Sequence, residues 1–446
     1  MHPAHPSLPA ILFVSFAGLL PAQEPSPRST TLDRAARDLP AAGTASAPTL
    51  GTQTGPIRLI DVSLDIMAAA GASSERDAVL GDLQGGGHDP KKRGFTLQQA
   101  ELSLAGAVDP YLQGKAHMVA LLDPDEGETL FELEEAYLTT QQLPYDLQVK
   151  AGTYLTEFGR INPTHPHQWD WQDQPVIHTR LFGGDGMRGP GARVSWLVPG
   201  STYGELFFGV QNANGETMPS FLANDEVYEE RAIGGRQFTE REVRSGNDLV
   251  YSARAVTSLD PSADSTLGFG ASALLGPNAT GGDADTVIWG VDFAWRWRPA
   301  SHRRGYPFWK LQGEFLARAF DAAEQTDDSD PLNPVTIPGE TLRDHGGYLQ
   351  LSHGFAEGWA AGVRVDWVSG SGDNYDADTQ SLVGRDGDPF RTDRVRVAPM
   401  LSFAPSEFSR IRLQYNYDDS DALDDPVHSV WLGFEVLIGT HPPHTY

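Results

Sequence analysis

The stretch DTVIWGVDFAWRWR, residues 285–298, alternates apolar and polar side chains from one end to the other. Because successive side chains of a β-strand point to opposite faces, this stretch has two distinct rows. One row holds Val287, Trp289, Val291, Phe293, Trp295 and Trp297, and the other holds Gly290, Asp292, Ala294, Arg296 and Arg298. The first row suits an apolar environment and the second suits water, which predicts a strand lying between the two.

The same alternation recurs along most of the chain, in segments separated by clusters of Gly, Pro, Asp and Asn. No composition shift divides the chain after residue 57. We expect about sixteen strands, which begin near Ile57, Phe95, Pro110, Leu130, Tyr145, Pro190, Tyr203, Asp248, Ser265, Asp285, Tyr306, Gly346, Gly358, Thr392, Phe408 and Val427.

Connection lengths distinguish a membrane barrel from a soluble sandwich, which also alternates. Every second connection is short, as at residues 108–110 and 143–145, whereas those between include the long stretches 71–94, 158–189 and 212–247. Short periplasmic turns alternating with long external loops are typical of outer-membrane barrels. The sequence therefore predicts an all-β fold, a transmembrane antiparallel up-and-down β-barrel of about 16 strands in a bacterial outer membrane.

Composition and the N-terminal region narrow the class further. The chain has 446 residues, no cysteine and a net charge of −27, so a disulfide scaffold or thiolate metal site is excluded and nucleic acid is disfavoured as a partner. The apolar run 8–20 is too short to span a membrane as a helix. We expect a signal peptide at 1–22, a disordered periplasmic linker at 23–56 and the barrel at 57–446.

Charged side chains on the inward rows are candidates for lining a pore, since inward-facing charge meets water. They are Arg296, Arg298, Lys310, Glu314, Arg318, Arg364, Asp366, Arg394, Arg396, Arg410 and Arg412, with Glu101, Glu132, Glu134, Lys115, His117 and Lys150 from earlier strands. Two interpretations stay open. The arginines form a path for anions such as phosphate or carboxylate, or they pair with Glu314, Asp292, Asp366 and loop acids to hold a polar interior.

The connection 158–189 is long enough to have a function of its own. It carries His165, His167, Trp169, Asp170, Trp171, Asp173 and His178. We expect this loop to fold inward and narrow the pore. His165 and His167 are also the best metal candidates, because neutral imidazole is a common Zn²⁺ ligand, and the alternative is a packed loop with solvated histidines.

Acidic clusters at 327–330, 373–378 and 418–425 fall in expected external loops. Such oxygen-rich loops suit Ca²⁺ or divalent bridges to lipopolysaccharide, but they lack the spacing of an EF-hand, and solvated acidic loops are the alternative. No other cofactor is expected.

Several short strings resemble one family. They are VDPY at 108–111, LEEAY at 133–137, GTY at 152–154, FGRIN at 158–162, HPHQW at 165–169 and GTHPPHTY at 439–446. Together they resemble outer-membrane porins related to the phosphate-selective porin O and P family, in the branch labelled zinc-regulated outer-membrane receptor.

The resemblance implies a pore open to the periplasm, usually a homotrimer, that transports a small hydrophilic solute and is not an enzyme. The partners expected with it are outer-membrane lipid, lipopolysaccharide and the barrel-assembly machinery. No plug domain is evident ahead of the barrel, so we expect passive diffusion. A receptor or channel for zinc or another metal, using the loop histidines, is the alternative function. Ser352 and His353 are adjacent in a strand and face opposite ways, so they form no catalytic pair.

Overall fold

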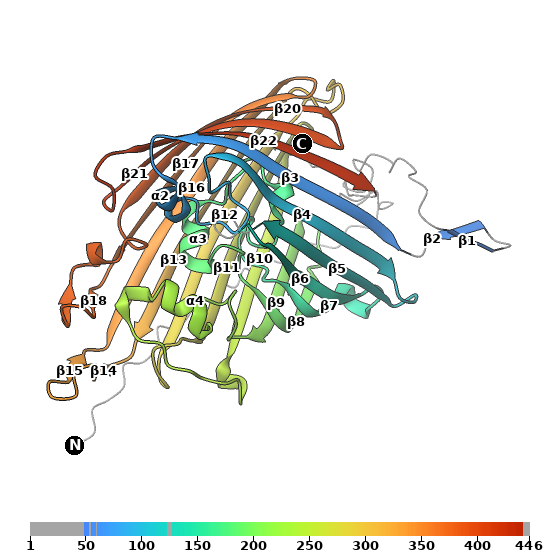
Figure 1. Cartoon of the computed structure of the whole chain (residues 1–446). Helices are drawn as coiled ribbons and strands as arrows, with labels where there is room; N and C mark the ends of the chain where they lie inside the picture. The colour runs from blue at the N-terminus through green and yellow to red at the C-terminus, as the bar shows by residue number, and fades with distance from the viewer. Residues whose placement is uncertain (1–48, 53–54, 59, 123–126, 440–446) are drawn as a thin grey trace. The chain divides into compact units, whose positions relative to one another are not determined.

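The computed structural model describes residues 49–52, 55–58, 60–122 and 127–439. Sixteen antiparallel strands form a closed barrel (Figure 1), in which the last strand pairs with the first. The strands are β3 (Asp61–Ser73), β4 (Gly94–Ala107), β5 (Leu112–Leu122), β6 (Thr129–Thr140), β7 (Leu147–Leu155), β8 (Arg188–Leu197), β9 (Tyr203–Asn212), β10 (Leu249–Ser262), β11 (Ser265–Pro277), β12 (Asp285–Trp297), β13 (Phe308–Ala322), β16 (Glu340–Ala356), β17 (Trp359–Ser371), β20 (Arg394–Ser406), β21 (Ser409–Ser420) and β22 (Val427–Gly439). The predicted barrel and its strand number are confirmed.

The remaining elements are short. Three two-stranded ribbons pair β1 (Thr49–Thr52) with β2 (Gly55–Arg58), β14 (Gln325–Asp327) with β15 (Val335–Ile337), and β18 (Asn374–Asp376) with β19 (Ser381–Val383). Among the described residues, the α-helices are α2 (Asp77–Leu83), α3 (Val176–Phe182) and α4 (Asp225–Glu230), and the other helical segments are 3-10 turns of three residues each. No helix in the described part of the chain is both long and apolar enough to cross a membrane. The expected signal peptide, most of the expected linker, and His441, His444 and Tyr446 lie outside the described residues.

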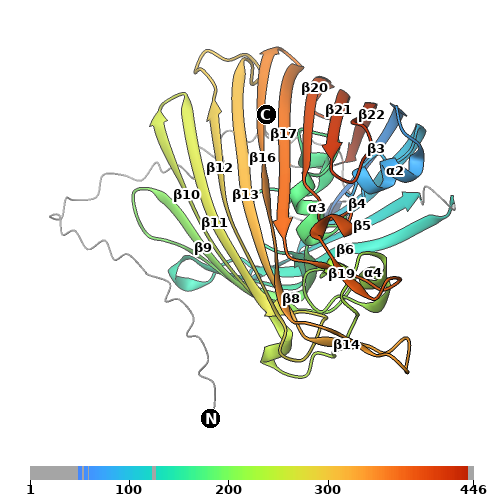
Figure 2. The same ribbon diagram turned by 90° about the vertical axis from the view of Figure 1, so that its left-hand side faces the viewer.

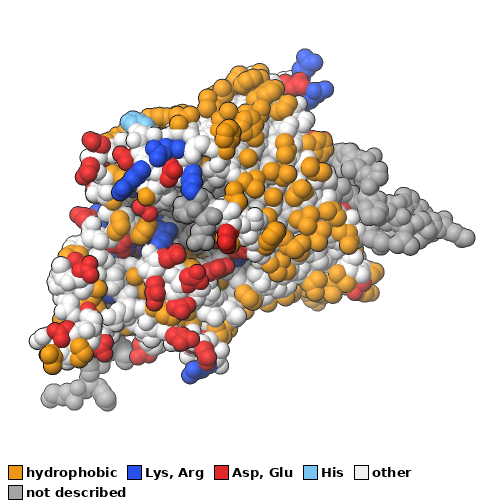
Figure 3. Space-filling view, in the orientation of Figure 1, with side chains coloured by type: hydrophobic (Ala, Val, Ile, Leu, Met, Phe, Trp, Pro, Cys, Tyr) orange, Lys and Arg blue, Asp and Glu red, His pale blue; other side chains and the backbone are white. Residues whose placement is uncertain are grey.

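Burial alternates along the strands as the two rows of side chains require. In β12, the side chains of Trp289 and Val291 are 48% and 49% exposed, whereas Asp292 is 5% exposed. The apolar row therefore faces outward and the polar row faces the interior, as the sequence predicts. Hydrophobic side chains cover the visible barrel wall, while charged side chains gather toward the end that carries α4, β14 and β18 (Figure 3). This arrangement suits a wall that contacts hydrocarbon outside and polar groups within.

The two ends of the barrel differ in their connections, as expected. One end has short turns, such as the two-residue connections at 263–264 and 357–358, and the other has the long connections 156–187, 213–248 and 372–393. The largest error in a strand start is at β16, which begins at Glu340 and not near Gly346. The additional residues at its start pair with the end of β13, through Ala322, so the two strands continue together toward the long connections.

Candidate functional site in the barrel interior

The connection between β7 and β8, residues 156–187, lies inside the barrel and is called the interior segment below. Thr156 donates a hydrogen bond to Gln211 of β9, and the Trp171 indole N–H donates to the carbonyl oxygen of Ala398 of β20. The Gln172 side chain donates to the carbonyl oxygen of Trp431 of β22. Strands on different sides of the barrel thus contact the same segment. Figure 2 shows α3 enclosed by the barrel walls.

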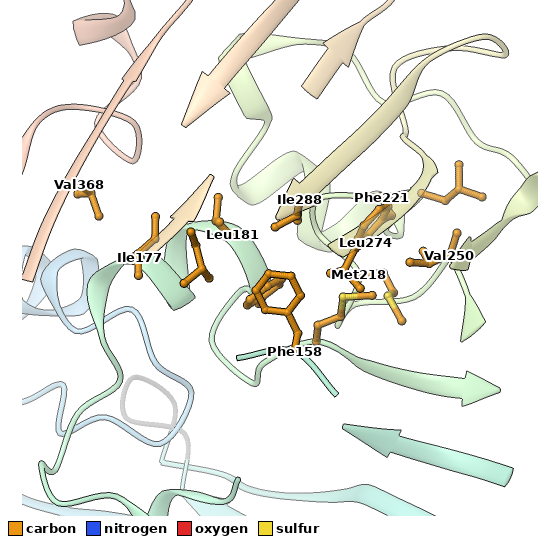
Figure 4. Close-up of a cluster of buried hydrophobic side chains, with 14 of the residues drawn as sticks. Phe158, Ile177, Leu181, Met218, Phe221, Val250, Leu274, Ile288 and Val368 are labelled. Carbon is orange, nitrogen blue, oxygen red and sulfur yellow. The ribbon is translucent and has the colours of Figure 1, made fainter. Parts of the chain in front are cut away.

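An apolar cluster holds both ends of the interior segment, near Phe158 and at α3 (Figure 4). Phe158, Ile177 and Leu181 of the segment are fully buried. They belong to a cluster with inward-facing residues of the strands, including Val250, Leu274, Ile288, Leu316 and Val368, and with Met218 and Phe221 of the connection 213–248. Burying a large apolar side chain stabilises by roughly 1.5–3 kcal/mol relative to exposure, so these contacts fix the position of α3 against the wall.

Asp173, in the middle part of the segment, is the centre of a buried ionic network. Its two carboxylate oxygens accept hydrogen bonds from Arg364 of β17 at 2.7 Å and from Arg396 of β20 at 2.8 Å. Asn416 of β21 donates to the same oxygen as Arg396, also at 2.8 Å. Arg364 additionally pairs with Asp366, its neighbour on the inward row, at 2.8 Å. Three adjacent strands therefore bind one carboxylate of the interior segment.

Two more inward arginines hold the backbone of the interior segment. Arg410 donates to the carbonyl oxygen of His167 at 2.8 Å, and Arg412 donates to those of Trp169 and Trp171 at 3.1 and 3.0 Å. Both guanidinium groups also pair with Glu435 of β22. The planar fork of arginine allows one side chain to serve a carboxylate and a carbonyl together.

The other predicted pore-lining cations also have partners. Arg318 pairs with Asp344 and Arg394 with Asp418, and the Lys310 ammonium lies 2.9 Å from Asp170 of the interior segment. Glu314 accepts hydrogen bonds from Tyr348 and from the backbone N–H of Ile161. Arg296 and Arg298 are half-buried near the short-turn end of β12. Of the two interpretations drawn from the sequence, this geometry favours the polar interior held by ion pairs.

The predicted residues of the early strands behave similarly, with one addition that alternation does not predict. Glu132 pairs with Arg188, and Lys150 lies 3.0 Å from Glu157. In β6, a bulge leaves Glu134 without a residue opposite it, because His117 of β5 pairs with Glu135 and the next residue pairs with Leu133. A bulge places two consecutive side chains on the same face of a strand. Glu134 and Glu135 are consequently both buried inside.

These two carboxylates meet the histidines of the interior segment. The ring nitrogens of His165 lie 3.1 Å from Glu134 and 3.0 Å from Glu135, and His167 Nδ1 lies 3.1 Å from Glu101 Oε2. Burial opposes a charge on His165, but Glu101 and the hydrogen bonds to Glu134 and Glu135 outweigh burial, so the pKa of His165 lies well above its ordinary value. The loop histidines are therefore packed and hydrogen-bonded, and are not solvated.

The placement of one acidic cluster differs from expectation. Asp418 was expected in an external loop, but β21 continues through Ser420 and turns Asp418 inward, where it is 1% exposed. Arg394 and Arg396 both donate to its carboxylate, which compensates the buried charge. Asp327 of β14 accepts a hydrogen bond from Tyr375 of β18 at 2.6 Å, so this acid links two ribbons at the long-loop end.

Comparison with known proteins supports the fold. No protein-family model matches the chain. An uncharacterized protein of Aquifex aeolicus (strain VF5) is 29% identical over 418 residues, which cover 87% of this chain and 80% of that protein. The outer membrane channel DcaP of Acinetobacter baumannii has a similar structure, with a TM-score of 0.53 and 11% identity over 88% of this chain and 100% of that chain.

Two further solved structures are similar. OprB of Pseudomonas putida gives a TM-score of 0.51 and 12% identity, over 85% of this chain and 94% of its own. The anion-selective porin from Comamonas acidovorans gives 0.50 and 9%, over 85% and 99%. The closed barrel of this chain and its apolar exterior place it in a bacterial outer membrane.

Proposed function

We propose that the protein is an outer-membrane porin through which small hydrophilic solutes diffuse, and that the interior segment forms its constriction. The observation that carries this proposal is the anchoring of residues 156–187 to many strands around the interior by buried charged groups. A polar lumen crossed by a fixed segment restricts solutes by size and charge. Diffusion through a pore requires no catalytic groups. The similarity of the fold to an outer-membrane channel is in line with this proposal.

We propose further that the pore prefers anions, such as phosphate or small carboxylates. Support comes from three cations that are half-buried rather than fully enclosed. Arg296 of β12 lies directly opposite Lys310 of β13, and Arg160 of the interior segment pairs with Asp292 on the same inward row as Arg296. The side chains of Arg160 and Lys310 are 27% and 23% exposed, so water reaches them. The guanidinium of Arg296 and the ammonium of Lys310, opposite each other on adjacent strands, would give a passing anion two donors at one level of the barrel.

The test is conductance of the purified chain in planar bilayers, with reversal potentials measured in a KCl gradient. We expect discrete single-channel currents. We also expect a reversal potential whose sign shows that chloride crosses more readily than potassium. The double variant R296Q/K310Q should reduce anion selectivity at least twofold, whereas R304Q, in an exposed turn where Arg304 pairs with Glu357, should not. Absence of channels would refute the porin proposal, and cation preference in the wild type would refute only the anion preference.

A deletion tests the constriction separately. Replacing residues 163–174 with a short Gly-Ser linker removes His165, His167, Trp171 and Asp173 but leaves the apolar cluster around α3. We expect single-channel conductance to rise severalfold. The porin proposal would survive an unchanged conductance, but the assignment of the constriction would not.

The oligomeric state and the partners are part of the same proposal. We propose a homotrimer, as the resemblance to the porin O and P family implies. We also propose contact with lipopolysaccharide and insertion by the barrel-assembly machinery. The mass of the detergent-solubilised protein, measured by light scattering, checks the trimer.

The histidine cluster favours a second candidate, a channel or receptor that binds zinc or another metal. It differs from the first in requiring a saturable metal site inside the barrel. The chemistry of such a site is argued below.

A further inference from the structure

Glu101, His117 and His165 bring three potential metal ligands together inside the barrel. Glu101 is on β4, His117 is on β5 and His165 is on the interior segment. One ligand atom from each lies within 4.8 Å of the others, and all three side chains are buried. Glu101 Oε1 is 2.7 Å from His117 Nδ1, and Glu101 Oε2 is 3.5 Å from His165 Nδ1. Zn–N bonds of about 2.0 Å place tetrahedral ligand atoms roughly 3.3 Å apart, which is close to this spacing.

The barrel wall supplies two of these ligands on rigid elements. Glu101 pairs with Val119, and His117 pairs with Ser103, so Glu101 and His117 are diagonal neighbours on the inward row. The third ligand arrives from the interior segment, where His165 directly precedes the single 3-10 turn Pro166–Gln168. Because the register of β4 and β5 holds Glu101 and His117, two of the three ligands lie on rigid strands.

Glu135 lies beside the Nε2 atoms of His117 and His165, on the ring edges opposite the Nδ1 atoms that face Glu101. The rings of His117 and His165 lie 4.2 Å apart at 31°, and Glu135 Oε2 is 3.0 Å from His165 Nε2 and 3.8 Å from His117 Nε2. His117 Nε2 is buried and has no hydrogen-bond partner among the described residues. A histidine that binds a metal through one nitrogen usually donates the other N–H to a carboxylate. Glu135 is placed for that role toward both rings.

Further donors and the local charge also suit a cation. Glu134 Oε2 lies 3.1 Å from His165 Nδ1, and His167 Nδ1 lies 3.1 Å from Glu101 Oε2. Either side chain is close enough to supply a fourth ligand. Glu101, Glu134 and Glu135 are three buried carboxylates within this small volume. Buried carboxylates require paired charge, which a divalent cation would supply.

We propose that Glu101, His117 and His165 bind a divalent transition-metal ion of the zinc class, with Glu134 or His167 as a fourth ligand. Two imidazoles and carboxylates suit Zn²⁺, whereas Ca²⁺ and Mg²⁺ prefer oxygen alone and Cu⁺ prefers sulfur. The ion replaces the protons now shared between the rings and the carboxylates, because metal ligands bind in their deprotonated forms. The sequence suggested His165 and His167 as the metal pair. The geometry instead makes His117 and Glu101 the partners of His165.

A bound ion would also join the interior segment to the wall. Two ligands belong to β4 and β5 and the third belongs to the interior segment, so the ion connects them directly. This inference goes beyond diffusion through a pore, and metal binding is measurable whether or not the chain conducts.

The experiment uses the full chain, folded in detergent, stripped with EDTA and titrated with Zn²⁺ alone by calorimetry. We expect one Zn²⁺ per chain and no response to Mg²⁺. E101Q, H117Q and H165Q should each weaken binding at least tenfold, and H302Q, at an exposed turn histidine, should not. Each variant is judged to be folded when its unheated sample migrates in a gel as the unheated wild type does. A stoichiometry of zero, or an H117Q variant that binds as tightly as the wild type, overturns the proposal.

Conductance separates this inference from the proposed porin function. We expect Zn²⁺ to change the single-channel conductance of the wild type and to have no such effect on H165Q. Zinc binding without channels would leave the metal site intact and remove the porin proposal. Channels without zinc binding would do the reverse. Zinc binding with unchanged conductance would show that the ion does not act on the interior segment.

Discussion

Arg364 and Asp173 form a buried ion pair across 2.7 Å, although 191 residues separate them in the chain. Arg364 donates through a second nitrogen to the backbone carbonyl of Asp173 at 2.9 Å. Both side chains are at most 1% exposed. This pair, with Arg396 on the other carboxylate oxygen, is the main ionic attachment between the interior segment and the wall.

The first prediction concerns the loss of this charge. D173N removes the anion shared by Arg364 and Arg396, and removing one partner of a buried pair costs roughly 3–5 kcal/mol. We expect about 3 kcal/mol, because Asp366 and Asp418 still face the two arginines. The interior segment should open more often, with larger fluctuations of single-channel current and an intact barrel. D330N in the external loop is the control, and equal fluctuations in both variants would show that Asp173 does not hold the segment.

Acid should act through the same carboxylate. Burial favours the neutral form of Asp173, but Arg364 and Arg396 outweigh burial and hold its pKa below the ordinary value. Because the pKa of Asp173 is lower in the folded state, its ionised form stabilises the folded protein at every pH above about 3.9, the ordinary pKa. This stabilisation is lost as the pH falls from that value toward the pKa of the folded state. Wild-type conductance should thus be flat from about pH 8 to 5 and change below about pH 4. The change should be smaller in D173N, and a transition only near neutral pH in the wild type would point to another group.

Trp171 tests the apolar contribution to the same attachment. Its side chain is 1% exposed, it is buried with Ala398 and Met400, and its indole N–H donates across 2.8 Å. Truncation of a buried tryptophan costs roughly 3–5 kcal/mol. W171A should accelerate hydrogen exchange in residues 165–175 without affecting the strands. W169A is the matched control, because Trp169 is half-buried and donates only within the interior segment. Similar exchange in the two variants would exclude this role.

Gly433 of β22 lies directly against Gln172 of the interior segment. A Cβ at this position would lie 1.9 Å from Gln172 Oε1, whereas a Cβ at Gly282 meets nothing within 4 Å. G433A should displace the Gln172 side chain, which donates to the carbonyls of Arg412 and Trp431. Each lost hydrogen bond costs about 1 kcal/mol.

A double-mutant cycle measures this contact. Once Q172A is present, G433A should cost much less, because the clash is gone. The measurement is the free energy of segment opening from hydrogen exchange, with G282A as the control. Strict additivity of Q172A and G433A would mean that the two residues do not touch in the folded protein.

The orientation of the strands has its own test. Val291 lies at the centre of β12 and faces outward, 49% exposed, while Ser258 of β10 lies on an inward row. Arginine on the lipid face near the bilayer midplane costs roughly 2–4 kcal/mol. V291R should lower the free energy of unfolding from lipid vesicles by about that amount, and S258R should change it little. The reverse order would mean that the two rows are assigned to the wrong sides.

The strands and their faces could be predicted because the signal is local. In β22, Val430, Leu432 and Phe434 alternate with Trp431, Gly433 and Glu435, and the structure exposes the first three. The direction of Arg364, Arg396, Arg410 and Arg412 follows from the same periodicity. Glu435, the partner of Arg410 and Arg412, is absent from the predicted residues, although its place on the inward row of the last strand makes it detectable.

Other parts of the site depend on contacts between distant residues. Nothing in LEEAY at 133–137 reveals that Glu134 is bulged, because the bulge exists only relative to β5. Consequently the inward position of Glu135 beside His165 could not be predicted. The continuation of β21 to Asp418 depends on its pairing with β20 and β22 and on the two arginines that compensate the charge.

Consecutive residues are enough to predict a closed barrel of about sixteen strands with apolar and charged rows, because the two-residue period of a strand is a local pattern. Which charges pair, the attachment of Asp173 to β17 and β20, and the meeting of Glu101, His117 and His165 follow only from the folded chain. Those contacts depend on barrel closure, register and one bulge, which bring residues far apart in the chain within a few ångströms and which no local pattern encodes.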